Sequence, residues 1–248
     1  MTAPRTALLP RPRAAEVLRD PTDPRRPWAA ALRTLACGAA VAGPVVALAT
    51  GYAPPPLIHF TVLASVLVAV AFGWSAVRSW RGAPPLPPYL TGAVLLLAAI
   101  TGLMHHLVLV NYGGSSDTGT GGSPSASLLL HTVTPLAVAA DWLLLTAPRT
   151  LRLAHIPLWL SAPAAYLGLI LTRGALLSPG SPARYPYPFL DVDTYGYAGT
   201  LTQALALGLL FAALGALITA MDHLRPNVTG WIQHRGNRIS PPAAGGLK

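Results

Sequence analysis

Six long apolar runs, separated by short polar loops, constrain this chain more than any other feature of its sequence. Each run approaches the roughly 20 residues that an α-helix needs to cross the hydrocarbon core of a bilayer. Only 10% of the residues are charged, against about 25% in an ordinary soluble domain. Because lipid offers the backbone no hydrogen-bond partners, a spanning run must be helical. The sequence therefore predicts an all-α, polytopic transmembrane protein built as a six-helix bundle.

The bundle is expected to be one transmembrane domain, residues 29–222, between two polar tails. Its predicted spans are residues 29–50, 57–77, 87–110, 125–147, 153–172 and 196–221. Residues 1–28 are rich in arginine and proline and have no apolar period, which is typical of a disordered basic tail. Residues 223–248 form the second tail. Cys37 is the only cysteine, so no internal disulfide is possible, and we interpret it as a helix-packing residue.

The distribution of basic residues predicts the orientation of the chain in the membrane. Most of the 17 Lys and Arg residues lie in the two tails and in the loops after the second and fourth spans. The positive-inside rule then puts both termini in the cytoplasm of a multi-pass protein of the cell membrane. The net charge of +9 does not indicate nucleic-acid binding, because no basic stripe is interleaved with aromatic side chains. The expected partner of the basic segments is the surface of the lipid bilayer.

The fourth span, SLLLHTVTPLAVAADWLLL, carries His131, Pro135 and Asp141 within an otherwise apolar run. Ionisable residues in a span are functional candidates by default. Pro135 has no N–H, so it leaves the carbonyl of His131 without its intrahelical donor and predicts a bend one turn below the histidine. Asp141 lies about 15 Å deeper than His131. It is expected to form a structural clamp with a cation near the cytoplasmic end, namely Arg149, Arg152 or His155.

Polar residues of three predicted spans fall at one depth. Thr61 lies roughly 6 Å inside the outer boundary of the second span, and His131 lies about 9 Å inside the boundary of the fourth. His105 and His106 of the third span share this depth, and His59 lies just above it. Because adjacent helical residues point about 100° apart, at most one of His105 and His106 is expected to line a pocket.

Thr61 and His131 are the predicted catalytic pair. A threonine hydroxyl is a poor nucleophile until a base takes its proton, and histidine is the commonest such base. The alternative for Thr61 is plain helix packing, and the alternative for His131 is a bridge between helices.

The segment YPYPFLDVDTYGY, residues 185–197, departs from an ordinary linker because it is aromatic and rich in proline. Such a segment suits either an interfacial cap over the outer polar layer or a simple aromatic belt, and the sequence leaves both open. Arg173, at the end of the fifth span, is available to pair with Asp191 or Asp193.

Several motifs occur in a fixed order along the chain: HFTVLAS, LHTVTPLAVAADWLL, RGAL and YPYPFLDVDTYGY. Together they resemble the androgen-induced-protein (androgen-dependent TFPI-regulating protein) family, which has many bacterial integral membrane relatives. The resemblance covers about residues 30–222. It implies an intramembrane threonine hydrolase of fatty acid esters of hydroxy fatty acids, with the threonine of HFTV at Thr61 and the histidine of LHTV at His131. Ser65 stands where the bacterial pattern often has Asn, one turn below Thr61, and could bond it.

The expected function is therefore hydrolysis of a long-chain lipid ester that enters from the membrane. His105, His106 and Ser65 are candidate oxyanion donors, and His59 is a further candidate for binding. No cofactor is expected in this reading. One alternative is a haem-binding electron carrier, because histidines on different spans can serve as paired axial ligands. Another is a transporter or lipid-binding scaffold, although no halves of the chain repeat.

Overall fold

The computed structural model describes residues 26–49, 56–108, 123–181 and 184–226. Most of both predicted tails and the predicted loops at 50–55 and 109–122 lie outside these ranges. Within them the chain is helical and contains no strand. Six helical stretches are long and apolar enough to cross a membrane, which confirms the predicted all-α, six-span class. Each span begins and ends within a few residues of its predicted position.

The first two spans are single helices, α2 (Pro27–Ala49) and α3 (Phe60–Trp80). The third joins α4 (Pro88–Leu103) to a π-helical turn, η2 (Met104–Val108). The fourth consists of α5 (Pro124–Leu128), a second π-helical turn η4 (Leu129–Val133) and α6 (Thr134–Leu145). The fifth contains η5 (Leu153–His155), α7 (Ile156–Trp159) and α8 (Ser161–Leu176). The sixth is α9 (Val192–Leu224), and short 3₁₀ turns, η1 (Pro56–Ile58) and η6 (Pro188–Leu190), precede α3 and α9.

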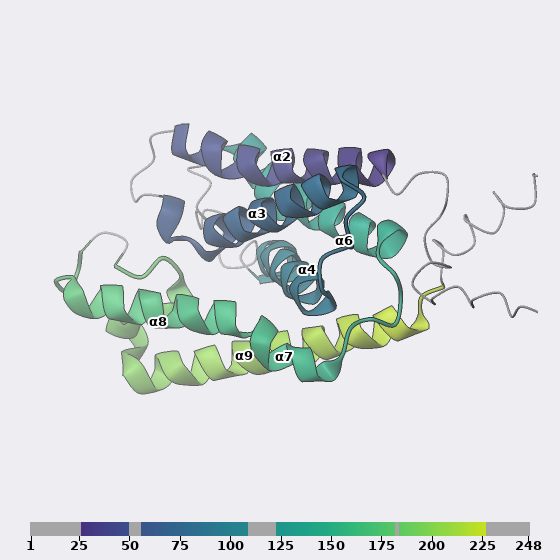
Figure 1. Cartoon of the computed structure of the whole chain (residues 1–248). Coiled ribbons are helices and arrows are strands. Elements are labelled where there is room, and N and C mark those ends of the chain that lie inside the picture. Colours follow the sequence, from purple (N-terminus) through teal and green to yellow (C-terminus); the bar gives the residue numbers. More distant parts are fainter. Residues whose placement is uncertain (1–25, 50–55, 109–122, 182–183, 227–248) are drawn as a thin grey trace, which may run out of the picture.

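Helix α4 is the centre of the bundle (Figure 1). It contacts α3 and α6 on one side and α7 and α9 on the other, and its residues Leu96 and Ile100 are fully buried. Helices α2 and α3 pack along each other, with the Cys37 thiol 3.3 Å from the carbonyl oxygen of Ala69. This contact confirms the interpretation of Cys37 as a packing residue.

Gly92 allows α7 to approach α4 closely. A Cβ atom at Gly92 would lie 2.1 Å from the indole ring of Trp159, a distance that no real side chain could keep. The same indole is fully buried and donates a 2.8 Å hydrogen bond to the carbonyl of Tyr89. One tryptophan thus fixes the fifth span against the central helix.

Asp141 pairs with Arg33, at an Nε–Oδ1 distance of 2.7 Å, and both side chains are largely buried. The Arg33 guanidinium also donates to the Ser79 hydroxyl, so three helices meet at this cation. The prediction that Asp141 pairs with Arg149, Arg152 or His155 is therefore wrong. The partner of Asp141 lies inside the first span and not in a loop or at a helix end.

Asp222, which is 0% exposed, organises the same end of the bundle. Its carboxylate accepts hydrogen bonds from the Trp142 indole and from the backbone N–H groups of Thr150 and Leu151. It also forms an ion pair with Arg225, 2.9 Å away. Because each partner of Asp222 comes from α6, from the loop after it or from the end of α9, this residue fastens the last helix to the fourth span.

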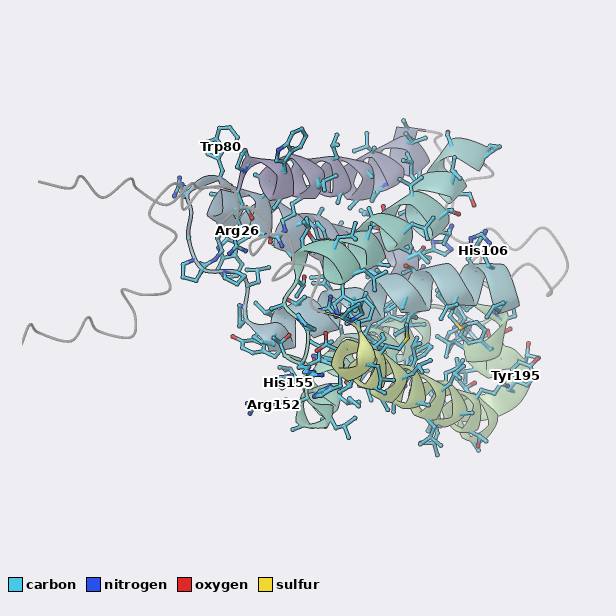
Figure 2. All side chains as sticks on the ribbon, turned by 90° about the vertical axis from the view of Figure 1, so that its right-hand side faces the viewer. Arg26, Trp80, His106, Arg152, His155 and Tyr195 are labelled. Atoms are coloured by element: carbon cyan, nitrogen blue, oxygen red, sulfur yellow. The ribbon has the colours of Figure 1, made fainter. Side chains whose placement is uncertain are left out.

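The two ends of the bundle carry different side chains (Figure 2). Arg26 and Trp80 lie toward one side of the molecule, and His106 and Tyr195 lie toward the opposite side. We call the first the arginine end, defined by Arg26, Arg33, Asp141, Asp222 and Arg225. The second is the histidine end, defined by His59, Thr61, His105, His106 and His131. Helix α2 begins and α9 ends at the arginine end. That this end faces the cytoplasm stays a prediction.

We expect the Asp141→Leu substitution to destabilise the fold by about 3–5 kcal/mol, because it leaves the buried Arg33 charge without its partner. The double variant Arg33→Met with Asp141→Leu should recover most of this loss, since an apolar pair needs no compensation. Thermal unfolding in detergent measures both. A single variant as stable as the wild type would show that the ion pair contributes nothing to the fold.

Candidate active site

The histidines of the third and fourth spans lie in two π-helical turns. His105 and His106 are in η2, and His131 is in η4. π-Helical turns are rare and occur frequently at functional sites. In η4 the N–H of Thr134 bonds to the carbonyl of Leu129, and the α-helix resumes with Pro135 in its first turn. The chain accommodates the missing N–H of Pro135 by widening the helix at the histidine.

The three histidines predicted at one depth, His105, His106 and His131, lie together in the structure, and we call them the histidine layer. The rings of His105 and His131 stack, with centroids 4.0 Å apart and planes only 9° from parallel. The His106 ring meets the His105 ring edge-on, with centroids 5.0 Å apart, and its Nε2 lies 3.1 Å from the Thr132 hydroxyl oxygen. The two neighbouring histidines therefore contact each other, and each also contacts a different residue of η4.

His131 is 1% exposed and its tautomer follows from its contacts. Its Nδ1 lies 3.1 Å from the carbonyl oxygen of Ser127, which can only accept, so Nδ1 carries the proton and donates. In the neutral ring Nε2 is then the acceptor, and this atom is buried with no hydrogen-bond partner among the described residues. A histidine held by one nitrogen, with a buried lone pair on the other, has the arrangement of a general base.

Thr61 is the second residue of α3 and lines a cavity of about 420 Å³. The walls come from α3, α4, the fifth span, the segment before α9, and α9 itself. Most lining side chains are apolar, including Ile100, Met104, Leu167 and Phe211. A cavity of this size and character suits part of a lipid chain, since ligand sites span roughly 300–1,000 Å³.

The aromatic segment before α9 lies over the start of α3, which favours a cap rather than a simple belt. Tyr187 and Leu190 are buried and line the cavity beside Thr61. The Phe60 N–H donates to the Tyr187 hydroxyl over 3.1 Å, and the Tyr166 hydroxyl donates to the carbonyl of Ile58 over 2.9 Å.

The loop acid Asp193 forms an ion pair with Arg184, and the Arg184 carbonyl accepts a hydrogen bond from Arg173. Arg184 lies in the same loop as the acid that it binds.

Two further predicted site residues lie close to Thr61 in the sequence and are buried with it. Ser65 is one turn further along α3 and is almost fully buried. His59 precedes α3, is buried as well, and meets the Tyr187 ring edge-on with centroids 5.9 Å apart. His59 thus belongs to the contact between the cap and α3.

The cavity and the histidine layer lie on two faces of one turn of α4. Thr101 lines the cavity together with Thr61, whereas His105, His106 and His131 do not. A Cβ atom at Gly102, the next residue, would lie 3.3 Å from the carbonyl oxygen of His131. Because Gly102 has no side chain, η4 packs closely against the face of α4 that points away from the cavity. Helix α3 also packs against η4.

The histidines of this layer form no metal-ligating cluster among the described residues. No group of three or more His, Cys, Asp or Glu side chains in the described ranges could hold a metal ion. The stacked rings of His105 and His131 leave no space for a haem between them, so this pair cannot supply its two axial ligands.

We expect Gly174→Ala in α8 to destabilise the protein by about 1–3 kcal/mol, because its Cβ would lie 2.3 Å from the Tyr185 ring at the base of the cap. Gly168→Ala is the matched control in the same helix, where a Cβ meets nothing within 4 Å. This control should be neutral or stabilising by up to about 1 kcal/mol. Equal melting temperatures for the two variants would contradict the seating of the cap on α8.

Comparison with known proteins gives no further assignment: no family model, no curated protein and no solved structure matches the chain. The resemblance of its motifs to the androgen-induced-protein family stays a prediction. The Thr61 cavity and the histidine layer are therefore the features that bear on function, because a helical bundle alone supports many activities.

Proposed function

We propose that the protein is an intramembrane hydrolase of long-chain lipid esters, with Thr61 as nucleophile and His131 as general base. The class of substrate includes fatty acid esters of hydroxy fatty acids, which the motif resemblance implies. The enzyme acts in the cell membrane with both termini in the cytoplasm. The observation that carries the proposal is the apolar cavity with the Thr61 hydroxyl-bearing side chain in its wall.

Three other hydroxyl-bearing side chains line the cavity. Thr101 donates to the carbonyl of Ala98 over 2.8 Å, as threonines in helices commonly do. Tyr166 and Tyr187 bond to backbone groups at the start of α3. Thr61 is the candidate nucleophile because of its place in the first turn of α3, where a helix presents its positive end.

His131 supports the proposal because its buried Nε2 has no hydrogen-bond partner in the part of the chain that the structure describes. The Ser127 carbonyl orients the ring through Nδ1, the role that a carboxylate has in a serine-hydrolase triad. For catalysis Nε2 must come within hydrogen-bond reach of the Thr61 hydroxyl. Catalytic hydrogen bonds often form only once substrate is bound.

The reaction follows from these roles. The Thr61 oxygen attacks the ester carbonyl carbon while His131 takes the hydroxyl proton, and His131 then gives that proton to the departing alkoxide. Water, deprotonated by His131, then attacks the acyl carbon, the bond to the Thr61 oxygen breaks, and His131 returns the proton to that oxygen as the carboxylic acid leaves.

The charge that develops on the carbonyl oxygen needs donors. We assign this role to the N-terminal turn of α3. His105 stacks on His131 and His106 contacts Thr132, so both rings already have contacts within the histidine layer.

The test compares hydrolysis of a long-chain ester by purified wild type and variants in lipid nanodiscs. Thr61→Val keeps the shape but removes the hydroxyl, and His131→Gln removes the base. Each should lower kcat about 10²–10⁴-fold. Thr61→Ser should retain measurable turnover, and the matched control Thr101→Val should stay near the wild type.

Turnover by Thr61→Val at the wild-type rate would refute the nucleophile. If the wild type binds the ester but hydrolyses none of it, the cavity is a lipid-binding site and the scaffold alternative is favoured.

A further inference from the structure

A second cavity, of about 820 Å³, lies at the arginine end and shares no lining residue with the Thr61 cavity. Its walls come from the start of α2, the second half of α3, the loop at 84–87, the beginning of α4, the end of α6 and the loop that follows it. Its volume lies within the range of small-molecule sites, roughly 300–1,000 Å³. The proposed hydrolysis makes no use of it.

The lining of this cavity divides into an apolar part and a charged part. The apolar part includes Ala71, Phe72, Val94, Leu95 and Val138. The charged part consists of Arg26, Arg33 and Asp141. A ligand that matches both parts has a hydrocarbon portion and a polar head.

The charges of the cavity favour an anionic head. Asp141 is neutralised by Arg33, so Arg26 gives the lining one surplus positive charge. Among the described residues the Arg33 guanidinium makes three hydrogen bonds, which leaves N–H groups of its five for a ligand.

The position of the cavity along the spans also fits an amphiphile. Trp28, which lines the cavity, and Trp80 at the same end are exposed large aromatics. Exposed tryptophans at a helix end mark the boundary between hydrocarbon and headgroups. A ligand here would hold its head at the boundary and its chain among the spans.

We propose that this cavity binds a single-chain anionic amphiphile with a carboxylate head, such as an ionised fatty acid. The carboxylate contacts Arg26 and the unused N–H groups of Arg33, and the chain runs along Phe72, Val94 and Val138. The proposal does not depend on hydrolysis at Thr61.

The test uses palmitic acid that carries a diazirine in mid-chain and a terminal alkyne, with the corresponding alcohol as uncharged comparison. After irradiation of the full-length protein in detergent at pH 8, labelled peptides are mapped by mass spectrometry. The acid should label cavity-lining residues of α3, α4 and α6, and the alcohol should need about tenfold higher concentration. Equal labelling by the two probes, or labelling of the lipid-facing surface alone, would overturn the proposal.

Two variants sharpen the result. Arg26→Gln should weaken binding of the acid about fivefold and leave the alcohol unchanged. Ala71→Phe fills the cavity and should reduce labelling at least tenfold, whereas Val70→Phe, at a position 65% exposed on the same helix, should not. Equal labelling of the two phenylalanine variants would refute the site. The absence of any labelling of the wild-type cavity would refute it as well.

Discussion

The lack of hydrogen-bonding partners in a hydrocarbon solvent is the constraint on which the rest of this structure depends. Every polar group placed in a span must find its partner inside the protein. At the arginine end the buried charges have partners, since Arg33 binds Asp141 and Ser79, and Asp222 accepts from side-chain and backbone donors of α6 and the following loop. These contacts tie the first, second, fourth and sixth spans together.

Among the described residues, the histidine end leaves several buried polar atoms without hydrogen-bond partners. Within the described residues, Nδ1 of His105, Nε2 of His131 and the hydroxyl of Thr134 are buried and make no hydrogen bond. Leaving such atoms unsatisfied costs stability, so each needs an explanation. For Nε2 of His131 the proposed explanation is that this atom accepts the proton of the nucleophile when substrate is bound. The position of His131 beside the wall of an apolar cavity fits this role.

Much of the architecture could be predicted from sequence because span length and apolarity follow directly from the thickness of a bilayer. The shared depth of His105, His106 and His131 also followed from helix rise alone. The pairing of Asp141 with Arg33 could not be predicted, because the depth of a residue along its span does not show which helix lies beside it. The orienting carbonyl of Ser127 was missed too, although its place four residues before His131 was a signal in the sequence.

The sequence also could not predict that α4 separates the Thr61 cavity from the histidine layer. Residues at one depth can lie on opposite faces of a helix, and Thr101 and Gly102 show this at adjacent positions: one lines the cavity and the other meets His131. Thr61 lines the cavity and His131 does not, so the proposed reaction requires that the two side chains approach each other when substrate binds.

The central claim is that Thr61 becomes a nucleophile through His131. The most direct measurement is treatment of the membrane-embedded protein with a lipophilic fluorophosphonate, followed by peptide mass spectrometry. The account predicts a covalent adduct on Thr61 that disappears in the His131→Gln variant. An adduct at another residue, or undiminished labelling of Thr61 without His131, would contradict it.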